Sequence, residues 1–169
     1  TQEIVPLSVA MPVNAFPATI TVAEDALFSF SGGSAASVAD RDDNLVSVRL
    51  TVTKGTLAVT LGTTGATISA GANNSATLTL AGTQTQINAA LATLTYQGTL
   101  DFNGSDTLTV VATDALGATD TDAVAITVSA VNDSPVNTVP GAQVVAEDTA
   151  LVFSGAATIS RSEEHTSEL

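Results

Sequence analysis

Hydrophobic and polar residues alternate along most of the chain, with Val, Leu, Ile and Ala set between Thr and Ser. Residues 45–52 show this pattern clearly, and a period of two is typical of a half-buried β-strand. Gly, Asn, Asp and Ser fill the intervals between such segments, as turns require. The same pattern predicts further strands at 56–61, 66–69, 76–80, 105–113 and 123–130.

One segment has helical spacing instead. Thr83 and Gln86 stand at the N-cap and N3 positions of a capping box. The apolar residues that follow recur at i, i+4 and i+7, which places them on one helical face; they are Ile87, Leu91 and Leu94. The spacing predicts a short helix near 84–92 that packs over one end of the sheets.

Short strands in this number, with one helix, predict an all-β fold, an immunoglobulin-like antiparallel β-sandwich. Aromatic residues make up 4% of the chain, so we expect a mainly aliphatic core. The core candidates are Phe28, Phe30, Leu50, Leu57, Tyr96, Phe102, Leu108 and Val110.

A sequence signature occurs twice. Val13-Asn14-x-x-Pro17 precedes Ala23-Glu24-Asp25, and Val131-Asn132-x-x-Pro135 precedes Ala146-Glu147-Asp148. The Glu-Asp pairs lie 123 residues apart (147 − 24) and the prolines 118 (135 − 17), so this alignment gives the second copy five extra residues. A period of this length indicates tandem whole domains rather than a solenoid of small repeats.

The repeat predicts four segments. Residues 14–131 form a complete repeat, and 132–160 begin the next. Residues 1–13 match the last strand of a preceding repeat, since Leu7-x-Val9 parallels Ile126-x-Val128. Residues 161–169 differ in composition from the rest and contain the only His; the string resembles a translated sequencing-library adapter, and we expect no structural role for it.

Composition narrows the classes of function. The formal net charge is −13 with four Lys and Arg residues, which argues against binding to nucleic acid or anionic lipid. The chain has no Cys, so disulfides and thiolate metal sites are excluded. No run approaches the roughly 20 apolar residues that a membrane-spanning helix needs.

The acidic residues gather at predicted strand ends, and none occurs between Asn44 and Leu100. Several carboxylates at one end of a sandwich repel one another unless they share a cation. Oxygen ligands without His or Cys favour Ca²⁺. The alternative is that these residues are ordinary turn residues on an acidic surface.

The order of the acidic motifs resembles that of a cadherin repeat over about residues 14 to 155. The composition of the chain, rich in Thr, Ala and Val, is similar to that of the cadherin-like repeats of large bacterial surface adhesins of the RTX type, which a type I system secretes. The motifs are Ala23-Glu24-Asp25, Ala39-Asp40-Arg41-Asp42, Leu100-Asp101-Phe102-Asn103, Thr113-Asp114-x-x-Gly117 and Val131-Asn132-Asp133-x-Pro135.

The resemblance implies two Ca²⁺ sites, both incomplete in this chain. A lower site would use Glu24, Asp101, Asn103, Asn132 and Asp133. An upper site would use Asp40, Asp42 and Asp114, with Asn14-Ala15 lacking the usual linker acid.

The resemblance therefore predicts a calcium-rigidified structural repeat of an extended adhesin on the outside of a bacterial cell, presenting a distal binding domain. Its partners would be neighbouring repeats and Ca²⁺ ions, without nucleic acid or membrane insertion. The alternative is a repeat that itself binds a glycan or a protein, although the chain has no Trp and one Tyr for a glycan surface. We expect no enzymatic activity, because a Ser-His-Asp triad would need His165 of the tail.

Overall fold

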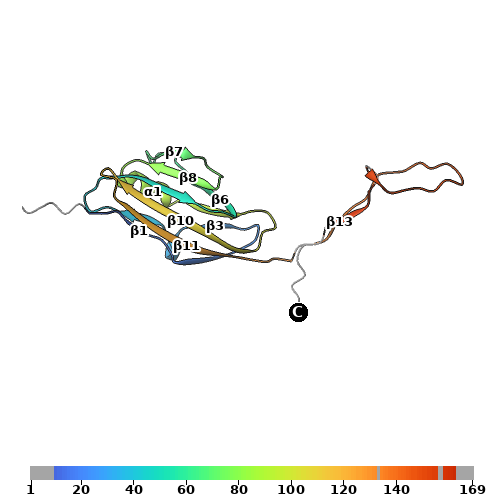
Figure 1. The fold of residues 1–169 in the computed structure, drawn as a ribbon, viewed down its shortest axis with the longest axis horizontal. Helices are drawn as coiled ribbons and strands as arrows, with labels where there is room; N and C mark the ends of the chain where they lie inside the picture. The colour runs from blue at the N-terminus through green and yellow to red at the C-terminus, as the bar shows by residue number, and fades with distance from the viewer. Residues whose placement is uncertain (1–9, 133, 156–157, 163–169) are drawn as a thin grey trace, which may run out of the picture. The chain divides into compact units, whose positions relative to one another are not determined.

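A computed structural model describes residues 10–132, 134–155 and 158–162. The chain forms two compact units, Thr1–Ser129 and Ala130–Leu169. The first unit is built of β-strands with one α-helix, which confirms the all-β sandwich (Figure 1). No helix in the described part of the chain is long and apolar enough to cross a membrane.

The larger sheet of the first unit has six strands. The hairpin of β10 and β11 lies near its middle, and the two strands pair over their whole length because a tight turn joins them. In spatial order the strands are β2 (Thr19–Ala23), β11 (Thr119–Ser129), β10 (Gly104–Asp114), β5 (Leu45–Thr51), β8 (Thr77–Ala81) and β7 (Thr67–Gly71).

The smaller sheet contains β3 (Leu27–Ser29), β9 (Thr95–Gly98) and β6 (Gly55–Ala58). A separate ladder pairs β1 (Val13–Ala15) with β4 (Ser37–Ala39). One pair departs from the predicted antiparallel arrangement, since β2 runs parallel to β11. These strands are far apart in sequence, so no hairpin fixes their relative direction.

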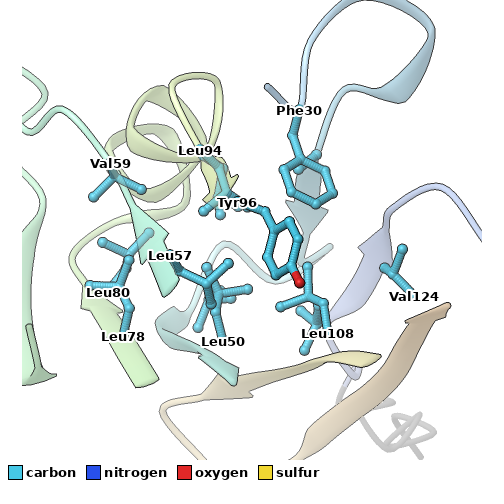
Figure 2. Close-up of a cluster of buried hydrophobic side chains, with 14 of the residues drawn as sticks. Phe30, Leu50, Leu57, Val59, Leu78, Leu80, Leu94, Tyr96, Leu108 and Val124 are labelled. Carbon is cyan, nitrogen blue, oxygen red and sulfur yellow. The ribbon is translucent and has the colours of Figure 1, made fainter. Parts of the chain in front are cut away.

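The core lies between the two sheets. Figure 2 shows the Tyr96 ring among Phe30, Leu57 and Leu108. Six of the eight core candidates are buried, while Phe28 and Phe102 are partly buried and pack against the cluster. Phe28 meets Phe30 edge to face at 5.1 Å between ring centroids, a favourable geometry for aromatic pairs.

The predicted helix is α1 (Gln84–Leu91), and its capping box is present. Ile87 and Leu91 are buried, as is Leu94 after the helix. The amide of Asn88 pairs with both backbone groups of Val38, accepting from the N–H at 2.8 Å and donating to the C=O at 2.8 Å. The helix therefore closes the outer edge of β4 with a side chain that acts as a strand neighbour.

Some strands end earlier than predicted, because side chains take the place of a neighbouring strand as hydrogen-bond partners of the backbone. The strand predicted at 56–61 ends at Ala58, because the Asn73 amide pairs with the N–H and C=O of Val59 at 2.9 Å each. The pairing of β7 is irregular between Ile68 and Ala70. The three-residue strands β1, β3 and β4 were not predicted, because alternation needs more residues to be visible.

The described part of the second unit repeats the start of the first at a constant offset of 123 residues. Its strands β12 (Val136–Thr138) and β13 (Ser160–Ser162) pair as β1 and β4 do, with Asn137 opposite Arg161 where Asn14 faces Val38. Left-handed backbone recurs at the same offset, with φ of 61° and 60° at Asp25 and Asp148. Pro17 therefore corresponds to Pro140 rather than Pro135, and the five extra residues disappear from the alignment.

Candidate functional site

Four polar side chains lie at one end of the first unit, which we call the Asp40–Asp114 pole. Asn14 lies on β1, Asp40 follows the neighbouring strand β4, Asn44 precedes β5, and Asp114 ends β10. Asp114 pairs with Leu45, directly after Asn44, and the Ala115 N–H donates to the Asn44 carbonyl at 2.9 Å. The exposed fractions are 8% for Asn14, 5% for Asp40 and 2% for Asp114.

Each aspartate of the pole uses one oxygen to hold its own turn. Asp114 Oδ1 accepts from the N–H groups of Leu116 at 2.8 Å and Ala118 at 2.7 Å, which shapes the β10–β11 hairpin. Asp40 Oδ1 accepts from the Asp42 N–H at 3.2 Å. The second oxygen of each, Oδ2, is buried without a hydrogen-bond partner, and so are the Oδ1 atoms of Asn14 and Asn44.

Two neighbouring aspartates anchor the N-terminal segment instead. Asp42 is exposed, and its Oδ2 accepts from the Ala10 N–H at 2.8 Å. Asp120 accepts from the Asn14 N–H at 2.7 Å through Oδ2, and its carbonyl accepts from Asn14 Nδ2 at 3.0 Å. Asp42, which was predicted as a metal ligand, thus has a defined structural partner, and Asn14 and Asn44 join the pole in its place.

Three of the five residues predicted for a lower site, Glu24, Asp101 and Asn103, lie at the other end of β11 and around the loop before β10. Glu24 is buried, and Asn103 Nδ2 donates to its Oε2 at 3.4 Å. Asp101 is exposed, and its N–H donates to Asp25 Oδ1 at 3.1 Å. Asn132 is exposed and belongs to the second unit, and Asp133 lies outside the described residues.

Within the residues that the structure describes, no three His, Cys, Asp or Glu side chains come together in an arrangement that could hold a metal ion. The Asp40–Asp114 pole offers two carboxylates and two amides instead. Ca²⁺ binding by the predicted residue sets remains a prediction.

A further buried carboxylate, Asp106 on β10, was missed as a functional group because it was counted with the acids at the strand ends. It accepts hydrogen bonds from Thr53 (N–H at 3.0 Å, hydroxyl at 2.7 Å), Lys54 N–H at 3.0 Å, Thr107 N–H at 2.7 Å and the Tyr96 hydroxyl at 3.0 Å. Its place two residues before the inward-facing Leu108 is the signal that predicts an inward side chain.

The surroundings of Asp106 and Tyr96 shift the pKa values of both side chains. Burial alone would raise the pKa of Asp106, but the hydrogen bonds from Thr53, Thr107 and Lys54 outweigh it and hold that pKa below its ordinary value. Burial, together with the adjacent Asp106 charge, raises the pKa of Tyr96. The carboxylate therefore stays ionised and ties the segment after β5 to the core.

The outer face of the six-stranded sheet has a different character, and we call it the threonine face. Its side chains alternate with the buried ones along each strand, and the pairings of β2, β11, β10, β5 and β8 bring them side by side. Within these described strands Arg49 is the charged residue on this face. The members are Thr19, Thr21, Ala23, Ser47, Arg49, Thr51, Thr77, Thr79, Ala81, Ser105, Thr107, Thr109, Val111, Thr113, Thr119, Thr121, Ala123, Ala125, Thr127 and Ser129.

Comparison with known families corrects the expected origin of the chain. The family model described as "Protein GAMETE EXPRESSED 2 domain" matches residues 37–123, which is more than half of the chain. No curated protein matches the chain.

The expected membership of the cadherin-like repeats of RTX-type bacterial adhesins is therefore wrong, and so is the function of a calcium-rigidified adhesin repeat at a bacterial surface. The physical reason is that the motifs behind it are common turn chemistry. Asp25 and Asp101 have left-handed backbone, with φ of 61° and 59°, and Asp114 caps its own hairpin turn. The matched segment covers most of the sandwich from β4 to β11, and the chain belongs to the Protein GAMETE EXPRESSED 2 domain family.

Proposed function

We propose that the chain is a non-catalytic binding module of a gamete protein, and that it meets a protein partner through its threonine face. The name of the matching family supports a role in gametes. The carrying observation is that a chain with a net charge of −13 keeps acidic side chains off this face within the described strands.

The composition of the face suits contact with another protein. Interface centres are depleted of charged residues, since burying an unpaired charge is costly. Thr109 and Ala123 lie directly opposite each other on this face, as do Thr127 and Thr21. Such short side chains lose little conformational entropy on contact, and the hydroxyls offer donors and acceptors to a partner.

The use of the buried polar groups supports binding rather than catalysis. Asp106 and Tyr96, whose pKa values are shifted, are buried in the core and engaged with backbone groups. A catalytic pair with shifted pKa values would instead face a cleft that a substrate can enter. Their role in this proposal is to fix the scaffold beneath the face.

The experiment measures binding of the fluorescently labelled full chain to intact gametes and to somatic cells by flow cytometry. We expect gamete-selective binding that Thr109→Lys weakens, because the new charge sits at the centre of the face. Gln97→Lys, on β9 of the other sheet, is the matched control and should leave binding unchanged. Equal binding to both cell types, or equal loss in both variants, would contradict the proposal.

A further inference from the structure

The Asp40–Asp114 pole concentrates an unusual set of atoms. In the described part of the chain, the buried side-chain oxygens or nitrogens without a hydrogen-bond partner are Asn14 Oδ1, Asp40 Oδ2, Asn44 Oδ1 and Asp114 Oδ2. All four are oxygens, and all belong to this one end of the first unit. Buried polar atoms are rarely left unpaired, because an unpaired atom has lost its hydrogen bonds to water without gaining new ones.

The chemistry of the four atoms specifies what would satisfy them. Each is an acceptor, and two carry the charge of a carboxylate. The other oxygen of each carboxylate is already engaged by backbone N–H groups at Asp42, Leu116 and Ala118. The turns therefore also fix the positions of Asp40 Oδ2 and Asp114 Oδ2, as a preorganised site requires of its ligands.

A single water molecule would satisfy the set poorly. Water donates two hydrogen bonds, so two of the four acceptors would stay unpaired. Water also leaves the two carboxylate charges uncompensated. The side chain of Arg41, the cationic residue next to Asp40, is exposed.

We propose that the Asp40–Asp114 pole binds one hard divalent cation through Asp40 Oδ2, Asp114 Oδ2, Asn14 Oδ1 and Asn44 Oδ1. Two carboxylates match the charge of such an ion, and amide oxygens are ordinary ligands for it. The ligands come from three segments, β1, the connection between β4 and β5, and the end of β10, an irregular set that suits the flexible coordination of Ca²⁺ better than the strict octahedron of Mg²⁺. Water would complete the coordination shell.

The proposal shares Asp40 and Asp114 with the predicted upper site, but it rests on the buried, unpartnered oxygens and does not need the chain to be an adhesin repeat. It uses Asn14 and Asn44, and it leaves out Asp42, whose carboxylate is engaged by the Ala10 N–H. It is also independent of the threonine face, so either proposal can fail without the other.

The first test is isothermal titration of the full chain with CaCl₂ and, separately, with MgCl₂. We expect saturable binding of one Ca²⁺ at the pole and weaker binding of Mg²⁺. Asp114→Asn keeps Oδ1 as the acceptor for the hairpin turn but removes the charge of the ligand. It should weaken Ca²⁺ binding by about tenfold or more.

The matched control is Asp122→Asn, an exposed carboxylate of β11 outside the ligand set. It should leave the dissociation constant unchanged. Absence of saturable Ca²⁺ binding, or the same affinity in Asp114→Asn as in the parent chain, would overturn the proposal.

A second variant, Asn44→Ala, tests the site in case Asp114→Asn does not fold. Asn44→Ala removes one unpaired oxygen, so in chelator its melting temperature should equal or exceed that of the parent chain. In excess Ca²⁺ the order should reverse, because the parent gains stability from a ligand that the variant binds less well. Equal destabilisation of Asn44→Ala in chelator and in Ca²⁺ would mean that the amide has only a structural role.

Discussion

The Tyr96 hydroxyl donates a hydrogen bond to Asp106 Oδ2 at 3.0 Å inside the sandwich, and both side chains are buried. Figure 2 shows the hydroxyl at the end of the ring that lies near Leu108. The bond joins β9 of the smaller sheet to β10 of the larger one. Because the same carboxylate also holds Thr53 and Lys54, it couples three parts of the fold.

Tyr96→Phe should therefore destabilise the first unit by about 1.5–3 kcal/mol, the usual range for a hydrogen bond to a charged group. The phenyl ring keeps the packing, and the other donors to Asp106 remain. Urea unfolding followed by circular dichroism measures the change in the free energy of unfolding. A loss below about 0.5 kcal/mol, the range of neutral surface changes, would show that the bond contributes little.

Asp106 should also make stability depend on acid. Its folded-state pKa lies below the value of an unfolded Asp, so it contributes stability that is present above about pH 4 and lost as the pH falls through the folded-state pKa. Melting temperatures of the parent chain and of Asp106→Asn, measured from pH 7 to pH 2, check this. The difference between the two proteins should shrink toward low pH, and a constant difference would contradict the assignment.

The cap of α1 offers a smaller, local test. Thr83 Oγ1 accepts from the Gln86 N–H at 3.4 Å, and the Gln86 side chain accepts from the Thr83 N–H at 2.9 Å. Thr83→Ala should cost about 1 kcal/mol of unfolding free energy. Thr85→Ala, an exposed position inside the same helix, is the control and should be neutral or slightly stabilising.

Gly55 on β6 is required for space rather than for backbone freedom. A Cβ at this position would meet the Gln97 carbonyl oxygen and would lie 2.6 Å from a Tyr96 ring carbon. Gly55→Ala should therefore destabilise the chain by about 1–3 kcal/mol or more, because overpacking forces the backbone to move.

Gly33 provides the comparison for Gly55. A Cβ there would meet nothing within 4 Å, and its φ is not in the left-handed region. Gly33→Ala should be neutral or stabilise the chain by about 0.4–1 kcal/mol through the unfolded state. Thermal unfolding of both variants separates the two cases, and equal losses would indicate that the crowding at Gly55 is relieved without cost.

Periodicity predicted the long elements well, because each buries one face. The strand at 45–52 and the helix near 84–92 appear within a residue or two of their predicted ends. The pairing of segments that are distant in sequence was harder to predict. The parallel pairing of β2 with β11 and the amide of Asn88 against Val38 depend on contacts that no local pattern encodes.

The candidate site was predicted only in part for the same reason. Asp40 and Asp114 were singled out as acids at strand ends, and the fold brings them to one end with their free oxygens buried. Asn14 was noted only as part of a linker, Asn14-Ala15, that lacks the usual acid, and Asn44 was not singled out. Their importance follows from the absence of a donor near each amide oxygen, a property of packing that a sequence does not display.

The placement of charge in the first unit also sets how copies of the molecule can approach one another. Carboxylates gather where strands end, whereas the broad face built by β10 and β11 is close to neutral. At low ionic strength two molecules that meet tip to tip repel each other more strongly than two that meet flank to flank. Because salt at 0.1 M limits such repulsion to about 10 Å, crowded chains should align sideways in dilute buffer and lose that directional bias as salt is added.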